Sequence, residues 1–139
     1  MPITKPYLLL LSIILLCTGL NAAAQNTNIP TPTRTTLAEM LAKIPGPNGE
    51  RYAVGMERGS LRLLVYAPRG NDPQTPHQQD EVYIVVKGTG TFFDGKQRIP
   101  FEPNDILFVP AGAEHRFENF SDDFVAWVVF YGPKGGEKD

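Results

Sequence analysis

Short runs of strand-forming residues follow one another from Arg51 onward, and they constrain the fold more than any other feature of the sequence. Each run is rich in Val, Ile, Leu, Phe and Tyr and is bounded by residues that favour turns. The runs are Leu61–Tyr66, Glu81–Lys87, Thr91–Phe93, Arg98–Phe101, Ile106–Val109, His115–Phe120 and Val125–Tyr131. Because no helical period appears after residue 45, these closely spaced strands predict an all-β sandwich or barrel.

The first 24 residues have the pattern of an export signal rather than of a folded domain. A basic start precedes an apolar run at 7–17, and Ala22 and Ala24 form a small-residue cleavage site before Gln25. The alternative is a membrane anchor, but the run is shorter than the roughly 18 to 20 apolar residues that span a bilayer. We therefore expect an exported protein, periplasmic or secreted, with no membrane segment after cleavage.

The segment between the signal and the strands predicts a polar, flexible lead-in that ends in a short helix. Thr36 and Glu39 match a capping box, which predicts a helix from Leu37 to about Lys43. The expected division of the chain is a signal peptide at 1–24, a lead-in with the helix at 25–48, the β-barrel at 49–133 and a polar tail at 134–139.

Charge and composition narrow the classes of partner. Removal of residues 1–24 leaves 12 basic and 15 acidic residues, a net charge of −3, with no basic run that could neutralise phosphates. We therefore expect no nucleic-acid partner. The only cysteine lies in the signal, so the mature domain has no disulfide bond. The runs Val82–Val86 and Val125–Tyr131 are apolar on both faces, which predicts contact with a second sheet or a second subunit, and we expect a homodimer.

Two histidines and one glutamate stand out as candidates for chemistry. His77 and His115, the only histidines, each directly precede or begin a predicted strand, and Glu81 begins another. Side chains alternate along a strand, so Glu81 and Tyr83 share one face. If the faces that carry Glu81 and His115 both point inward, a carboxylate and an imidazole meet among apolar neighbours, and a bound cation would offset the unfavourable burial of charge. The alternative is that His77 and His115 are ordinary polar residues at strand ends and that Glu81 is a surface acid in an acidic pair with Asp80.

Two longer motifs contain these residues. Residues 76–88, Pro-His-Gln-Gln-Asp-Glu-Val-Tyr-Ile-Val-Val-Lys-Gly, resemble the first cupin motif, in which a histidine, a glutamate and a glycine recur at set spacing. Residues 103–119 resemble the second, with proline, glycine, histidine and asparagine at set spacing. From about Gly59 to Tyr131 the chain is similar to small single-domain, RmlC-like cupins of the type-2 conserved barrel. The resemblance implies a double-stranded β-helix, or jelly-roll barrel.

The resemblance also implies one divalent metal ion, held by His77, Glu81 and His115. Two imidazoles and a carboxylate form the ligand set of non-haem iron(II) oxygenases, although Mn, Ni, Co or Zn would also fit. Cupins with a full metal set carry a further histidine where this chain has Thr75. Thr75 or Gln79 could supply an auxiliary oxygen ligand or hold a water molecule.

By resemblance, cupins catalyse dioxygenation, decarboxylation or isomerisation of small molecules. We expect a metal-dependent enzyme that acts on a small oxygen-rich substrate, with Tyr83 as the candidate for proton chemistry. The alternatives are a non-catalytic module that binds a small ligand, and a structural protein that docks on a partner. Arg62 and Arg116 alternate with apolar neighbours, and we expect both to be solvated; an inward arginine would favour an anionic substrate.

Overall fold

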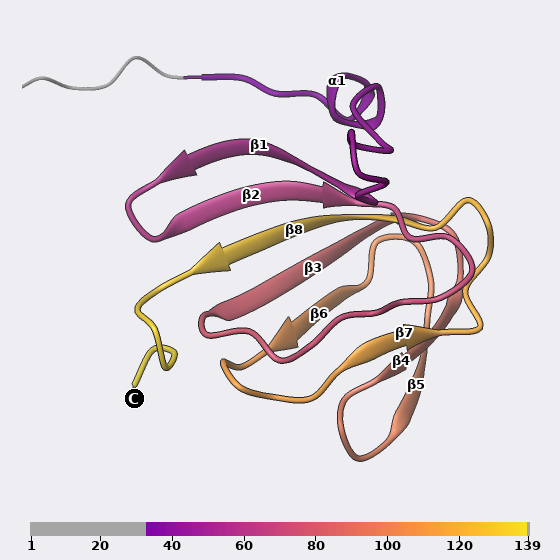
Figure 1. Cartoon of the computed structure of the whole chain (residues 1–139). Coiled ribbons are helices and arrows are strands. Elements are labelled where there is room, and N and C mark those ends of the chain that lie inside the picture. Colours follow the sequence, from indigo (N-terminus) through magenta and orange to yellow (C-terminus); the bar gives the residue numbers. More distant parts are fainter. Residues whose placement is uncertain (1–32, 139) are drawn as a thin grey trace, which may run out of the picture. The chain divides into compact units, whose positions relative to one another are not determined.

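Residues 33–138 are described by a computed structural model, and they form a mostly β structure with one short helix (Figure 1). The elements are α1 (Leu37–Leu41), β1 (Tyr52–Arg58), β2 (Leu61–Tyr66), β3 (Asp80–Lys87), β4 (Gly90–Phe93), β5 (Arg98–Phe101), β6 (Ile106–Val109), β7 (Arg116–Glu118) and β8 (Val125–Tyr131). The predicted export signal lies outside the described residues, as does most of the polar lead-in.

The strands form two antiparallel sheets, a larger one in the order β1-β2-β8-β3-β6 and a smaller one in the order β5-β4-β7 (Figure 1). Buried side chains from both sheets fill the space between them. They include Leu64 and Tyr83 from the larger sheet and Phe92, Phe101 and Phe117 from the smaller one. The prediction of an all-β jelly-roll barrel is confirmed.

Seven of the observed strands coincide with predicted runs, but β1 was not among them. Its pairing with β2 shifts register between Val54 and Met56, around Gly55. A bulge of this kind breaks the alternation of apolar and polar residues by which a strand is recognised. The strand also ends in the charged pair Glu57 and Arg58, so its sequence lacks the apolar character of the other runs.

Helix α1 begins with the predicted capping box. The Thr36 hydroxyl accepts a hydrogen bond from the Glu39 backbone N–H (3.3 Å), and the Glu39 carboxylate accepts one from the Thr36 N–H (2.8 Å). Met40 packs into a second apolar cluster with Val65 and Val125, which lie on the outer face of the larger sheet. The helix therefore covers some of the face for which the sequence predicted a second sheet or subunit, around Val65 and Val125.

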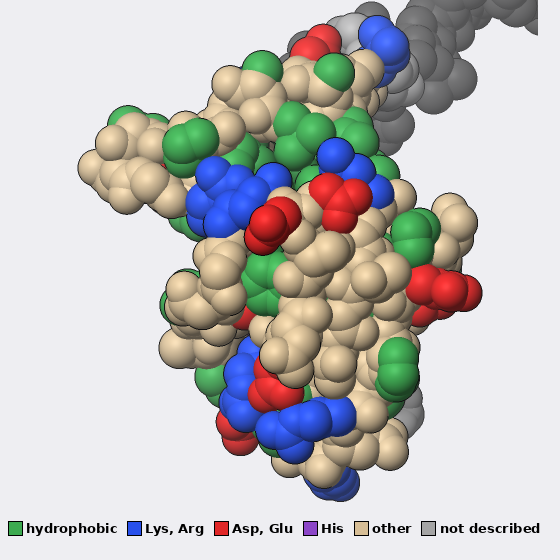
Figure 2. All heavy atoms as spheres, turned by 90° about the vertical axis from the view of Figure 1, so that its right-hand side faces the viewer, with side chains coloured by type: hydrophobic (Ala, Val, Ile, Leu, Met, Phe, Trp, Pro, Cys, Tyr) green, Lys and Arg blue, Asp and Glu red, His purple; other side chains and the backbone are tan. Residues whose placement is uncertain are grey.

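Charged side chains of both signs are interspersed on the side of the molecule that Figure 2 shows. On the smaller sheet, Arg116 forms ion pairs with Glu114 and Glu118 (2.9 Å each), and Arg98 forms one with Glu118 (2.8 Å). Arg116 is therefore solvated at the surface, as the sequence indicated. Within residues 33–138, no helix is long and apolar enough to cross a membrane.

Candidate metal centre

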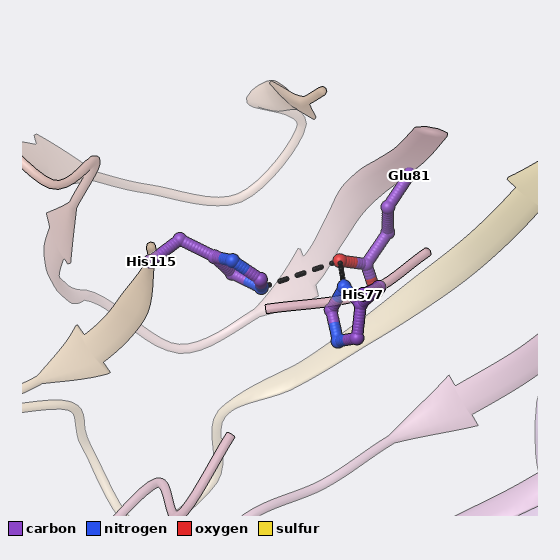
Figure 3. Close-up of side chains that lie close together, drawn as sticks. All are labelled: His77, Glu81 and His115. Carbon is purple, nitrogen blue, oxygen red and sulfur yellow. Dashed lines mark ion pairs between the residues drawn. The ribbon is translucent and has the colours of Figure 1, made fainter. Parts of the chain in front are cut away.

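The three side chains that the motifs single out lie together between the two sheets (Figure 3). His77 is on the segment that leads into β3, Glu81 is in β3, and His115 directly precedes β7. Their ligand atoms all lie within 4.8 Å of one another. Glu81 and His115 are only 1% and 2% exposed, which excludes the alternative that they are surface residues.

The atoms of this cluster are close together but are not joined by hydrogen bonds. Glu81 Oε2 lies 2.8 Å from His77 Nδ1 and 3.3 Å from His115 Nε2. Both Glu81 Oε2 and His77 Nδ1 are nevertheless buried without a hydrogen-bond partner among the described residues, because the groups are not aligned for one. Buried polar atoms are rarely left without a partner. Several buried lone pairs that point toward one position can be satisfied by a cation bound at that position.

The orientation of His115 also suits a metal ligand. Its Nδ1 lies 3.1 Å from the backbone oxygen of Ala113, so Nδ1 carries the proton and donates to that carbonyl. In the neutral ring, Nε2 then presents its lone pair to Glu81 and Tyr83. A histidine that ligates a metal through one nitrogen commonly donates through the other in this way.

The pKa values of the cluster reflect the mutual attraction of its charges. Burial by itself would raise the pKa of Glu81, but the close contacts with the His115 and His77 side chains together outweigh it and hold the pKa below the usual value. Burial by itself would lower the pKa of His115, but the Glu81 carboxylate outweighs it and raises the pKa. Glu81 is therefore a carboxylate at neutral pH, which is the form that binds a cation.

Hydrogen bonds fasten the two loops that carry the histidines. The Gly112 N–H donates to the His77 backbone oxygen (2.7 Å), which ties the loop before β7 to the loop before β3. Asp80, only 5% exposed, accepts from the backbone N–H of Ala111 (2.9 Å) through one oxygen. Its other oxygen accepts from the Glu137 N–H (2.8 Å), so the predicted polar tail packs back onto this site.

The family model described as Cupin domain matches residues 62–131, half of the chain and all but one of its eight described strands. The chain belongs to the cupin family. A relative from Streptomyces coelicolor, an uncharacterized protein, is 40% identical over 75 residues, which are 54% of this cupin and 71% of the relative.

Other relatives of this cupin have assigned activities. The acireductone dioxygenase of Parvibaculum lavamentivorans is 39% identical over 64 residues, which are 42% of this chain and 35% of that enzyme. The cupin thus matches about a third of the length of that relative. Among solved structures, a putative mannose-6-phosphate isomerase from Ralstonia eutropha has a TM-score of 0.52 at 22% identity, covering 73% of this chain and 100% of that one. This likeness shows the fold alone.

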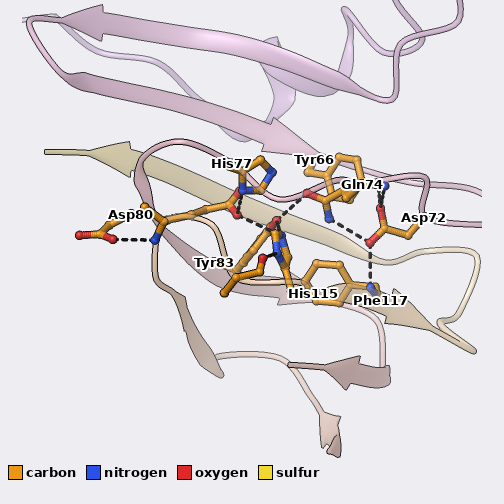
Figure 4. Close-up of polar contacts among 11 residues, drawn as sticks. Tyr66, Asp72, Gln74, His77, Asp80, Tyr83, His115 and Phe117 are labelled. Carbon is orange, nitrogen blue, oxygen red and sulfur yellow. Dashed lines mark hydrogen bonds and ion pairs between the residues drawn. The ribbon is translucent and has the colours of Figure 1, made fainter. Parts of the chain in front are cut away.

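A polar network that sequence reasoning missed extends the cluster of this cupin (Figure 4). Tyr83 donates its hydroxyl to the side-chain oxygen of Gln74 (2.6 Å), and the same hydroxyl lies 3.2 Å from His115 Nε2. Asp72 accepts from the Gln74 amide (2.9 Å) and from the Phe117 backbone N–H (2.7 Å). Asp72 and Gln74 lie in the loop between β2 and β3, where no periodic pattern marked them.

The two residues predicted as auxiliary ligands lie in different places. Thr75 is exposed and lines the same cavity as His77 and Glu81. Gln79 instead donates its side-chain amide to the backbone oxygens of Ser60 (3.0 Å) and Gly132 (2.8 Å). Gln79 therefore bridges two loops beside a separate hollow and does not join the cluster, which corrects its predicted role.

A cavity of about 480 Å³ opens beside the cluster. His77 and Glu81 form part of its wall. The inner faces of β2 and β8 supply much of the rest, through Arg62, Leu64, Tyr66 and Phe130. The His77 ring packs edge-on against Phe130, with 4.9 Å between ring centroids. The cupin therefore has room for a small molecule directly beside the candidate metal ligands.

Proposed function

We propose that this cupin is an exported metal-dependent enzyme, of the dioxygenase type, that acts on a small oxygen-rich molecule. His77, Glu81 and His115 would hold one divalent ion of Fe, Mn, Ni, Co or Zn. The observation that carries the proposal is the convergence of His77 Nδ1, Glu81 Oε2 and His115 Nε2, with the first two buried and unsatisfied within residues 33–138. An iron(II) ion in such a ligand set supplies Lewis acidity and reactivity toward dioxygen when it is bound.

The choice of a dioxygenase is supported by the match to acireductone dioxygenases. That match is 39% identical over 64 residues, but it spans only about a third of the enzyme. We therefore propose for this chain the class of reaction of that enzyme, dioxygenation, and not its substrate. Decarboxylation and isomerisation, which the sequence left open, have no comparable support.

The chain's own residues would bind the substrate and manage protons. Leu64, Val128 and Phe130 give the cavity an apolar wall beside His77, against which the carbon atoms of a substrate would pack. Burial, and secondly the charge of Glu81, raise the pKa of Tyr83 well above its usual value. Tyr83 therefore keeps its proton at neutral pH and would act as a hydrogen-bond donor or acid rather than as a base.

Dioxygen consumption tests this proposal. We would load the protein anaerobically with iron(II) and screen enediols, hydroxy ketones and hydroxy acids with an oxygen electrode. Glu81→Gln should lose both iron and activity, whereas Glu114→Gln, a change at a surface carboxylate (61% exposed side chain), should keep both. Iron-loaded protein that binds these compounds without consuming dioxygen would contradict the proposal and favour the non-catalytic binding module.

We propose further that the protein is a homodimer joined through the outer face of the larger sheet. Phe108, Val82, Val129 and Leu63 lie opposite one another across β6, β3, β8 and β2 and form an apolar row. Ile106 and Phe108, two residues apart on β6, are 69% and 56% exposed, and neighbouring exposed apolar side chains of this size mark an interaction surface. These positions carry no charge, so a second copy related by a two-fold axis is a complementary partner.

Export is proposed from the signal pattern alone. Cleavage before Gln25 would release a chain that contains every residue of the barrel. Mass spectrometry of the protein from periplasmic and culture fractions tests this proposal. A product that starts at Gln25 supports it, and a cytoplasmic product that retains residues 1–24 would contradict it.

A further inference from the structure

Arg62 lines the cavity and is also solvated as expected, because 41% of its side chain is exposed. Arg62, Leu64 and Tyr66 alternate along β2 and all line the cavity, so they share the inner face of the strand. Leu64 and Tyr66 belong to the buried core, and Arg62 is the residue of this face nearest the start of the strand. A guanidinium thus stands at the margin of an otherwise largely apolar wall.

The strand register places Arg62 in line with the candidate metal ligands. Arg62 pairs with Phe130 across β2 and β8, and Phe130 pairs with Glu81 across β8 and β3. Two strand spacings therefore separate the backbones of Arg62 and Glu81, roughly 10 Å. The His77 ring, which packs against Phe130, lies beside the same row. A molecule of a few carbon atoms is long enough to extend from the cluster toward this arginine.

The guanidinium of Arg62 forms one ion pair that water screens, and it retains donors for an anion. Its nearest acidic group is Glu57, with 3.3 Å between Arg62 Nε and the carboxylate, but the Glu57 side chain is 65% exposed and the pair is screened by water. Within residues 33–138 the buried Nε atom has no hydrogen-bond partner. The partners of Arg62 thus leave its planar donor group available for a carboxylate, which it matches in a bidentate manner.

Two other charged residues of the wall make hydrogen bonds within the chain. Arg51 donates its Nε to the Ala67 backbone oxygen (2.9 Å), which holds it against the chain. The Glu50 carboxylate accepts from the backbone and the side chain of Asn48 (2.9 and 2.8 Å). Arg62 is therefore the cavity-lining group best suited to bind the charged end of a ligand.

We propose that the cavity binds a small dicarboxylate that carries a hydroxyl or keto oxygen beside one carboxylate. The oxygen-bearing end would lie at the cluster of His77, Glu81 and His115, and the second carboxylate would bind Arg62. This inference rests on the proposed function, because it adds a second anchor for the substrate of the same site. It makes Arg62 the residue that selects dianionic over monoanionic substrates.

Calorimetric titration with a homologous series tests the inference. Lactate, malate and 2-hydroxyglutarate share one 2-hydroxy-carboxylate end, and the latter two add a second carboxylate at increasing distance. In metal-loaded protein, malate or 2-hydroxyglutarate should bind at least about tenfold more tightly than lactate, since one charge-assisted bidentate contact is added. Arg62→Gln should reduce this advantage to within about twofold, and Arg62→Lys should retain part of it.

A matched control is Arg58→Gln, which removes an exposed arginine of the same hairpin that does not line the cavity. It should leave the advantage intact, and circular dichroism should show every variant folded. An equal preference for the diacid in Arg62→Gln and wild type would overturn the inference. If the same protein contains about one equivalent of metal, the proposed function still stands. The reverse case is that the protein binds no metal, so that the proposed function fails, yet its preference for the diacid still depends on Arg62. Titration of the metal-free protein identifies this case.

Discussion

Asp72 fixes the orientation of Gln74: its carboxylate accepts a hydrogen bond from the Gln74 side-chain nitrogen at 2.9 Å. A carboxylate can only accept, so the amide oxygen of Gln74 must face the other way, toward the Tyr83 hydroxyl at 2.6 Å. Tyr83 therefore donates to Gln74, and its oxygen, 3.2 Å from His115 Nε2, can accept from that nitrogen only when the imidazole is protonated. The Asp72 carboxylate thus sets the direction in which the Tyr83 hydroxyl proton points, beside the cluster.

Asp72→Asn should disturb this arrangement while preserving the size of the side chain. The Asp72 carboxylate also accepts from the Phe117 N–H and the Tyr66 hydroxyl, and an amide cannot accept from every one of these donors. We expect the free energy of unfolding to fall by about 1–3 kcal/mol and metal affinity to weaken. Chemical denaturation and metal titration measure both effects. Asp122→Asn, at an exposed position, should change neither; equal behaviour of the two variants would refute the role given to Asp72.

Tyr83→Phe should separate proton chemistry from metal binding. The ring would keep its edge-on contact with Phe117, at 4.9 Å between centroids, so the core should remain packed. We expect metal content to be retained, stability to fall by about 1–3 kcal/mol because Gln74 loses its donor, and turnover to fall about 10²–10⁴-fold if Tyr83 donates a proton. Steady-state kinetics beside metal analysis checks this. Unchanged turnover would limit Tyr83 to a structural role.

Metal binding should weaken as the pH falls. The raised pKa of His115 means that metal-free protein keeps this imidazole protonated above the pH at which a free one would lose its proton. In metal-free protein, the stabilising contact with Glu81 is present at low pH and is lost as the pH rises through this pKa. Metal binding needs the neutral ring and should therefore release a proton.

The difference in melting temperature between metal-loaded and metal-free protein should consequently grow from about pH 5.5 to pH 8. Differential scanning calorimetry in buffers that do not bind metals measures this difference. A shift that stays constant across the range would show that His115 is not among the groups that exchange a proton for the metal.

Charge placed on the outer face of the larger sheet should dissociate the proposed dimer. Phe108→Glu puts a carboxylate in the apolar row opposite Val82, where a second copy would bury it unpaired. Light scattering after size-exclusion chromatography should give the mass of one chain. The matched control is Ile99→Glu, because Ile99 is also an exposed apolar residue (38%) but lies on β5 of the smaller sheet. A wild-type protein that is already monomeric would refute the dimer.

The candidate ligands could be predicted from the sequence because their geometry is local. Glu81 and Tyr83 share a face through the alternation of β3, and the two motifs place His77 and His115 directly before strands. Alternation likewise put Arg62 and Leu64 on one face, but it could not tell which face is inner. That choice depends on how the sheets pack, so the sequence left open whether Arg62 faces the cavity. Its side chain is solvated, as predicted, and also lines the cavity.

Other features depended on contacts between distant parts of the chain. Asp72 contacts Phe117, which follows it by 45 residues, and no spacing rule links a loop to a strand so far away. Gln79 was expected near the metal from its closeness to His77, but its amide bonds to Gly132 at the far end of β8. The bulge near Gly55 hid β1, because the register shift removed its alternation.

Metal content tests the central claim most directly. The protein would be purified without an affinity tag and analysed by mass spectrometry, beside His115→Ala and the neighbouring surface variant Glu114→Ala. We predict about one equivalent of iron, manganese, nickel, cobalt or zinc in wild type and in Glu114→Ala, and its loss in His115→Ala. Folded wild-type protein that takes up none of these ions, even after incubation with each, would contradict the assignment of His77, Glu81 and His115 as a metal site.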